Sequence, residues 1–136
     1  MGKEATESYI KAIYEAGEDG TPATTLELAK KLRVTPASVT EMLGKLAKQN
    51  YIIYIPYKGA SLTEKGRRQG EELIRKDRLL EAFLTTVLAL DKKEAAEAAC
   101  KMEHWLSVKG ARNLCRFLKH QRASPVSGKR IPPCSK

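Results

Sequence analysis

The stretch TTLELAKKLRVTPASVTEMLGKLAKQNYIIYIPYKGASL, residues 24–62, decides the fold of the first half of the chain. Its first four residues fit a capping box, in which a threonine oxygen accepts a backbone hydrogen bond and Glu27 reaches back. We expect a short helix from there to about residue 32, with a buried face made of Leu26, Leu28, Ala29 and Leu32. Thr35 and Pro36 then supply the N-cap and the N1 proline of a second helix.

The second helix has two distinct faces. Its apolar residues follow the i, i+3, i+4, i+7, i+8 spacing of a buried face, namely Val39, Met42, Leu43, Leu46 and Ala47. The opposite face carries Ala37, Ser38, Thr40, Glu41, Lys45 and Lys48. We expect the apolar face to pack on a core and the other face to meet solvent or a ligand.

A β-hairpin is predicted after the second helix. Residues 51–57 are rich in β-branched and aromatic side chains, Lys58 and Gly59 form a turn, and residues 60–62 return. With a helix over residues 5–16 in front, the order of elements is that of a winged helix-turn-helix. A small α+β core without a DNA-binding role is the alternative to this interpretation.

The winged-helix interpretation assigns a surface for double-stranded DNA. The second helix would enter the major groove with Ala37, Ser38, Thr40 and Glu41 toward base edges. Lys45, Lys48 and Lys58 would contact phosphates and make the affinity salt-dependent. The predicted DNA-binding residues are Thr35, Pro36, Ala37, Ser38, Thr40, Glu41, Lys45, Lys48 and Lys58.

The second half of the chain is predicted to be helical. A long helix from Thr63 to about Ala89 carries a wide apolar stripe, and helices over about 92–106 and 109–119 follow. The spare apolar surface predicts a homodimer, which would pair two recognition helices on a palindromic operator. The chain is therefore mainly α, with a winged-helix domain over 1–63, a helical dimerisation domain over 64–120 and a basic, loosely ordered tail over 121–136.

Charge and composition limit the function classes. The net charge is +9, and residues 107–136 hold 8 basic and no acidic residues, which permits DNA binding without identifying the surface. No apolar run is long enough for a bilayer, and the N-terminus lacks a signal-peptide core. Three cysteines without a C-x-x-C pair suit a reducing compartment, so we expect a cytoplasmic protein without a membrane partner. No enzyme fingerprint occurs, so we expect no catalysis and no small-molecule substrate.

Cys100, Glu103 and His104 form a candidate metal site. They stand at i, i+3 and i+4, so a helix would present all three on one face. Thiolate, carboxylate and imidazole together can hold a divalent first-row metal, although the same grouping also arises by chance on amphipathic helices. On the adjoining arc, we expect four residues in the core, namely Ala99, Met102, Trp105 and Leu106. A zinc hydrolase with Glu103 as its base would leave only two strong ligands, so this alternative is disfavoured.

Five stretches of the chain resemble a single protein family. They are Tyr9–Glu15, Val39–Leu43, Leu62–Gly66, Arg78–Glu81 and Ala99–His104. From about residue 6 to residue 134, the chain resembles the diphtheria-toxin-repressor and manganese-transport-regulator family, in its two-domain form without an SH3-like domain. The resemblance implies a dimeric repressor of metal-ion homeostasis genes that is activated by iron(II) or manganese(II). The 64–120 domain would then sense metal as well as dimerise.

The resemblance places Cys100, Glu103 and His104 in the primary metal site of the family. Ser8 stands where the family has a Met or Asp ligand, and Lys11 stands where manganese-type members have a carboxylate. The Cys100 thiolate favours iron(II) over manganese(II), and zinc(II) fits the same ligands in vitro. Metal binding would join the neighbourhood of Ser8 to the later ligands and so set the spacing of the recognition helices.

The second metal site implied by the resemblance is less complete. Asp77 and Ala96 stand at histidine positions, while Glu81 is kept. Asp77 and Glu81 form either a two-carboxylate site or a solvated acidic pair, and Ser124 and Ser127 replace a cysteine and a histidine of the family. These replacements favour one alternative, a winged-helix DNA-binding regulator that has lost metal control. A protein-interaction module is a further alternative, which absence of DNA affinity at low salt would distinguish.

Overall fold

The computed structural model describes residues 2–18 and 20–134 of the chain. The chain divides into two compact units, Met1–Glu71 and Glu72–Lys136. The division falls inside the long helix α4 (Glu64–Thr86), whereas the sequence predicts a boundary at residue 63. The first turns of α4 belong to the first unit because Gly70 lies against Tyr14, where an added Cβ would stand 2.9 Å from the Tyr14 Cβ.

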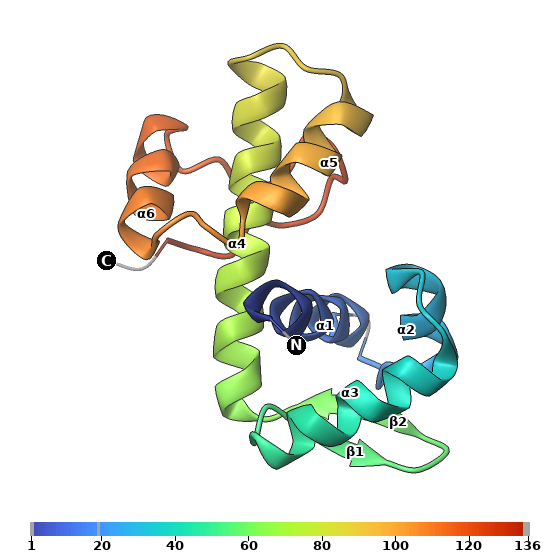
Figure 1. Ribbon diagram of the computed structural model, residues 1–136. Coiled ribbons are helices and arrows are strands. Elements are labelled where there is room, and N and C mark those ends of the chain that lie inside the picture. The colour runs from blue at the N-terminus through green and yellow to red at the C-terminus, as the bar shows by residue number, and fades with distance from the viewer. Residues whose placement is uncertain (1, 19, 135–136) are drawn as a thin grey trace. The chain divides into compact units, whose positions relative to one another are not determined.

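The first unit contains α1 (Lys3–Gly17), α2 (Thr25–Leu32), α3 (Pro36–Lys48), β1 (Ile52–Ile55), β2 (Gly59–Leu62) and the start of α4 (Figure 1). Both predicted N-caps form. Thr24 Oγ1 accepts a hydrogen bond from the Glu27 amide at 3.1 Å, and Thr35 Oγ1 accepts one from the Ser38 amide at 3.1 Å. Each such cap contributes about 1 kcal/mol to helix stability. The predicted winged helix-turn-helix is confirmed.

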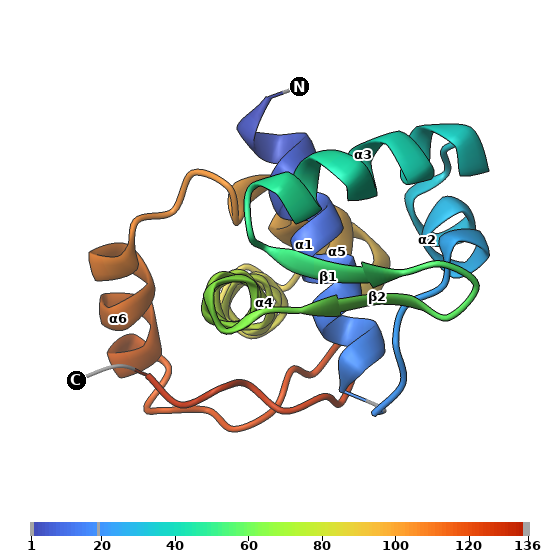
Figure 2. The ribbon, with the colours of Figure 1, turned by 90° about the horizontal axis from the view of Figure 1, so that it is seen from below.

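The two strands form the wing. β1 and β2 pair antiparallel, with Ile52 opposite Leu62. Ala23 adds a bridge to Ala60, with backbone hydrogen bonds of 3.0 Å and 2.8 Å in the two directions. Gly59 has a φ of 120°, and a Cβ at this position would collide with the Ala23 carbonyl, so only glycine permits this close approach. Figure 2 shows the hairpin beside α3, which contacts β1.

The core of the first unit is built largely from the helix faces that the apolar spacing predicts. Its largest buried side chains are Ile10, Ile13, Leu28, Val39, Met42, Leu43 and Leu46. Leu26 is an exception, because its side chain is 73% exposed. Residues two positions apart do not share a helix face, so Leu26 points away when Leu28 packs inward.

The second unit contains the rest of α4, α5 (Lys92–Met102) and α6 (Val108–Phe117). Asp91 and Ser107 cap the two shorter helices by accepting the Glu94 and Gly110 amides at 2.8 Å and 2.9 Å. Two apolar clusters hold the unit together, one around Leu79, Ala111, Cys115 and Ile131 and one around Leu80, Leu84, Ala95 and Ala99. Within the described residues, no helix is both long and apolar enough to cross a membrane.

Helix α5 is shorter than its apolar pattern suggests. It ends at Met102, and residues 103–105 form a turn, so the predicted extension to residue 106 is wrong. The expectation that Met102 and Trp105 lie in the core is also wrong, since they are 44% and 70% exposed. Both side chains lie at or beyond the helix end, where the helical periodicity that placed them inward no longer applies.

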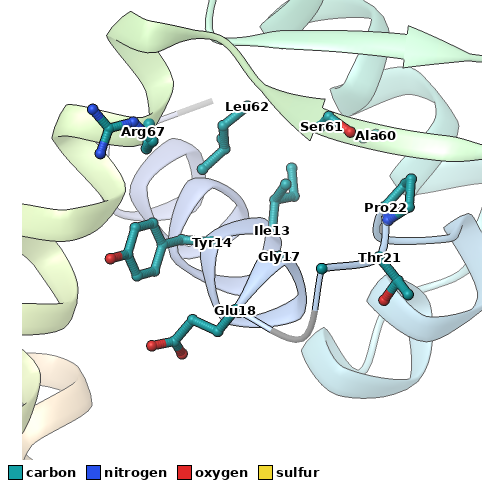
Figure 3. Close-up of a pocket in the computed structure, with 11 residues that line it drawn as sticks. Ile13, Tyr14, Gly17, Glu18, Thr21, Pro22, Ala60, Ser61, Leu62 and Arg67 are labelled. Carbon is teal, nitrogen blue, oxygen red and sulfur yellow. The ribbon is translucent and has the colours of Figure 1, made fainter. Parts of the chain in front are cut away.

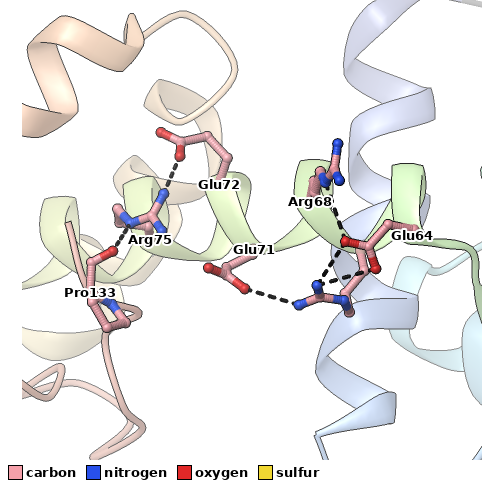
Figure 4. A network of polar contacts seen from close by, with 7 residues as sticks. Glu64, Arg68, Glu71, Glu72, Arg75 and Pro133 are labelled. Carbon is pink, nitrogen blue, oxygen red and sulfur yellow. Dashed lines mark hydrogen bonds and ion pairs between the residues drawn. The ribbon is translucent and has the colours of Figure 1, made fainter. Parts of the chain in front are cut away.

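Residues 121–134, here called the C-terminal segment, pack against the rest of the second unit. Ile131 is buried in the core, and the Arg75 Nε donates to the Pro133 carbonyl at 2.9 Å. Figure 4 shows Arg75 between Glu72, its ion-pair partner, and Pro133. This order differs from the loosely ordered tail predicted from composition, because buried donors on α4 satisfy the backbone of the segment.

Candidate DNA-binding and metal-binding residues

The polar face of α3 is open to solvent. Of the predicted residues, Ser38 is half-buried, and Thr35, Pro36, Ala37, Thr40, Glu41, Lys45, Lys48 and Lys58 are exposed. Thr40 Oγ1 donates to the Pro36 carbonyl at 3.1 Å, so its lone pairs remain directed outward as acceptors. Glu41 and Lys45 are 3.6 Å apart at exposed positions, where an ion pair is weak and easily exchanged for a ligand contact.

The tip of the wing combines a cation with exposed apolar side chains. Lys58 lies at the turn beside Tyr57, whose side chain is fully exposed and whose φ is 68°. Ile53 and Ile55 face outward on β1 and are 57% and 48% exposed. From the sequence, Lys58 was selected for its charge, but this apolar face was missed. One side of a two-stranded hairpin packs on the core, so the side chains on its other side stay exposed.

A hollow of about 430 Å³ lies within the first unit between α1, the hairpin and the start of α4 (Figure 3). Tyr14 and Leu62 contribute to its walls, together with Arg67. Arg67 pairs with Glu64 at 3.0 Å and with Glu71 at 3.5 Å. The Arg67 hydrogen bond and charge hold the pKa of the Glu64 carboxyl below its usual range. This arrangement stabilises the start of α4.

The predicted primary metal ligands differ in their surroundings. Cys100 is an exposed thiol near the end of α5, while Glu103 is 0% exposed and His104 is 5% exposed in the turn that follows. The expectation that one helix face presents all three is wrong for His104, because α5 ends at Met102. Glu103 is the C-cap residue and keeps helical backbone angles. Ser8, half-buried on α1, belongs to the first unit.

The two carboxylates of the predicted second site are also unequal. Asp77 is half-buried, and Glu81 is 7% exposed. Glu81 Oε1 accepts a hydrogen bond of 2.7 Å from the Ser124 hydroxyl, which is itself buried. The solvated acidic pair considered from the sequence is therefore wrong for Glu81. Ser127 is exposed and accepts a hydrogen bond from the Lys129 amide at 3.2 Å.

A different set of soft ligands comes together in the second unit. Within residues 2–18 and 20–134, the ligand atoms of Cys115, His120 and Cys134 lie within 4.8 Å of one another. Cys115 and Cys134 are joined by a disulfide, and Cys115 Sγ is 3.3 Å from His120 Nδ1. Because the three cysteines include no C-x-x-C pair, a reducing compartment was expected from the sequence, and this disulfide was not predicted. The available signal was a C-x₄-H spacing at the end of a helix, followed by a cysteine after two prolines.

Comparisons with known proteins agree with this architecture. Residues 1–60 match the N-terminal DNA-binding domain of iron-dependent repressors, and residues 63–133 match their metal-binding and dimerisation domain. A helix-turn-helix transcriptional regulator from Methanocaldococcus jannaschii is 42% identical over 105 residues, which cover 76% of this chain and 84% of the relative. The transcriptional regulator MntR of Bacillus pumilus is 34% identical over 134 residues, which cover 96% of this chain and 92% of the relative.

Among solved structures, the manganese regulator SloR superposes with a TM-score of 0.84 at 32% identity. The match covers 96% of this chain and 60% of the SloR chain. The two matched domains follow each other in the order that the two units do. The chain therefore belongs to the iron-dependent repressor family, whose members are metal-dependent, DNA-binding transcriptional repressors and not enzymes.

Proposed function

We propose that this chain is a cytoplasmic homodimer that represses metal-homeostasis genes by binding a palindromic operator once a divalent metal is bound. α3 would lie in the major groove with Thr40 and Glu41 toward the bases, and Lys45, Lys48 and Lys58 would contact phosphates. The observation that carries this proposal is the combination of an uncovered polar α3 face with a buried carboxylate and imidazole at the end of α5.

The proposed primary metal site consists of Cys100, Glu103 and His104. The donor set fits a divalent cation, because a carboxylate and an imidazole as buried as Glu103 and His104 require compensation by a cation or by donors. When bound, the metal supplies a fixed positive charge that holds these ligands in one arrangement. The Cys100 thiolate favours iron(II) over manganese(II), and zinc(II) would substitute in vitro.

The proposed homodimer is supported by apolar side chains that the second unit leaves exposed. Phe117 is 63% exposed and packs edge-on against Phe83, with ring centroids 6.1 Å apart. These rings line a hollow of about 430 Å³ together with Met102 and Leu106, and almost all of its surface is apolar. Such a surface on the exterior of a small domain is typical of a protein interface. A dimer would also present two α3 helices to the two halves of a palindrome.

Loss of metal control is a second candidate function, and one observation favours it. The Ser124 hydroxyl already donates a hydrogen bond to one oxygen of Glu81 at the position of the second site. A metal bound there by Asp77 and Glu81 would have to share the Glu81 carboxylate with this buried hydrogen bond. If the protein also needs no metal at the primary site, the winged helix would bind DNA in both the presence and the absence of metal.

Fluorescence anisotropy separates the two candidates. Labelled duplex DNA from the region upstream of the protein's own gene is titrated with protein under anaerobic conditions. Separate titrations contain iron(II), manganese(II), zinc(II) or a chelator. Selective binding that requires metal, strongest with iron(II), is the expected result. A scrambled duplex and the Lys92→Ala variant, exposed on α5, serve as controls for DNA selectivity and for general loss of charge.

Two outcomes would contradict the proposal. Tight selective binding that persists in the chelator would establish a regulator without metal control. Absence of affinity for any duplex at low salt, tested against a random genomic pool, would favour the protein-interaction alternative. Sedimentation equilibrium with Phe117→Ser tests the dimer separately, since this change should weaken association without altering the winged helix.

A further inference from the structure

The cluster of Cys115, His120 and Cys134 lies apart from the residues proposed above to bind metal. Its ligand atoms are within 4.8 Å of one another. Around a tetrahedral zinc ion with metal–sulfur bonds of about 2.3 Å and metal–nitrogen bonds of about 2.0 Å, neighbouring ligand atoms stand roughly 3.5–4 Å apart. We propose that, when the two cysteines are reduced, these three side chains bind one thiophilic divalent cation, for which zinc(II) is the best match.

The end of α6 places His120 over Cys115. The His120 amide donates to the Cys115 carbonyl at 2.9 Å, and the Lys119 amide donates to the Arg116 carbonyl at 3.0 Å. These two hydrogen bonds form a Schellman motif, which reverses the chain at a helix end. Lys119 and His120 both have a φ of 57°, a left-handed conformation that costs free energy for side chains of this size. The reversal brings the imidazole to 3.3 Å from the Cys115 sulfur.

The C-terminal segment brings Cys134 to the same point. The Ile131 amide donates to the Arg122 carbonyl at 2.7 Å and so closes a loop. The Pro133 carbonyl, next to Cys134, accepts a hydrogen bond from the buried Arg75 guanidinium. The third ligand is therefore positioned by contacts that do not involve sulfur, and these contacts support the site after the disulfide is opened.

The surroundings of the cluster suit two thiolates and an additional ligand. All three side chains line a hollow of about 410 Å³, which leaves space for water as a fourth ligand. Arg122 and Arg130 line the same hollow. Nearby cations favour ionisation of thiols, and the thiolate is the form that binds metal. Two thiolates, in turn, supply the charge that offsets a divalent cation beside these arginines.

The disulfide and the metal-bound form exclude each other, because a disulfide sulfur carries no thiolate charge. A dithiol reductant supplies the two electrons and two protons that convert the Cys115–Cys134 disulfide to thiols and is itself oxidised to a disulfide. Metal binding then releases both protons of the thiols. In the reverse direction, hydrogen peroxide takes two electrons from the thiolates and, with two protons, leaves as two waters while the cation is expelled. In a reducing compartment, where disulfides are rare, the metal-bound form is the one expected.

Cobalt(II) titration of the full-length protein tests the site, since a thiolate ligand gives cobalt a charge-transfer absorption. All proteins contain the Cys100→Ser substitution, which removes the thiol of the primary site. They are reduced with a phosphine, and a chelator then removes bound metal. We expect one cobalt(II) per chain with a thiolate band that zinc(II) displaces. Adding His120→Ala should lower the affinity at least about tenfold, and adding Cys134→Ser should remove most of the band.

Lys119→Ala, on the same turn but without a ligand atom, is the matched control and should leave the titration unchanged. At one fixed zinc(II) concentration, the rise in Tm should be larger for the Cys100→Ser protein than for Cys100→Ser with His120→Ala. Absence of a thiolate band in the reduced Cys100→Ser protein would overturn the proposal. An unchanged cobalt(II) affinity in the His120→Ala variant, or an undiminished band in the Cys134→Ser variant, would also overturn it. The site does not depend on DNA binding, so failure of the repressor proposal would leave it standing.

Discussion

The two candidate metal sites of the second unit differ in how their ligands are spaced along the chain. Cys100, Glu103 and His104 are neighbours in the sequence, yet they differ in exposure and straddle the end of α5. Cys115 and Cys134 are separated by 19 positions, yet their side chains meet. Short spacing therefore predicts a shared face only while the helix continues. Residues far apart in the sequence, such as Cys115 and Cys134, can still meet when a turn reverses the chain and a hydrogen bond from a buried side chain holds the returning segment.

The largest expected effect separates the roles of the two clusters. Cys100→Ala should weaken metal-dependent operator binding by about 100-fold, because it removes a ligand of the proposed sensing site. Cys134→Ser should retain the metal response. Anisotropy measured against metal concentration gives both values, with Lys101→Ala as the neighbouring control. Loss of the response in Cys134→Ser alone would transfer the sensing role to the second cluster.

The anchoring of the C-terminal segment can be tested without any metal. Ser124→Ala leaves the buried Glu81 without the hydroxyl donor and should lower the free energy of unfolding by about 1–3 kcal/mol. Ser127→Ala, in an exposed part of the same segment, should change it by less than about 0.5 kcal/mol. Urea unfolding of the reduced, metal-free proteins provides the comparison. Equal small effects would mean that this hydrogen bond does not hold the segment in place.

Recognition of the operator sequence by α3 should depend on neither candidate metal site. Thr40→Ala removes an outward hydroxyl from α3 and should weaken operator binding about tenfold, at the low end of what a base contact provides. Calorimetric titration of the protein alone should show unchanged metal affinity. A change in metal affinity without DNA present would contradict the separation of the two functions.

The smallest effect concerns the exposed ion pairs at the start of α4. Like Cys100, Glu103 and His104, their residues are close together in the sequence. Because Arg67 lowers the pKa of Glu64 below its ordinary 4.5, folding stabilises the charged carboxylate. This contribution is present above pH 4.5 and is lost as the pH falls through the lowered value. The stability difference between the wild type and Glu64→Gln should therefore shrink on acidification. Thermal unfolding across this range should detect it, and a difference that grows toward low pH would reverse the assigned sign.

Most of the first unit could be predicted because its signals are local. Thr24 and Thr35 cap helices through residues three positions away, and the spacing of Val39 to Leu46 selects one buried face. The error at Leu26 came from counting an apolar residue that lies off this face. At the end of α5 the same periodicity failed, since nothing between Met102 and Trp105 marks the stop in advance.

The sequence by itself determined the winged helix, the succession of helices and the family, because caps, turns and periodic apolar faces depend on residues close along the chain. Tertiary structure alone decided that Glu81 meets Ser124, that Arg75 holds the C-terminal segment and that Cys115, His120 and Cys134 converge. These contacts join positions far apart in the chain. Their formation depends on the direction that the backbone takes after the turn at the end of α6 and on which buried donors have no access to water. The spacing of residues along the chain predicts neither property.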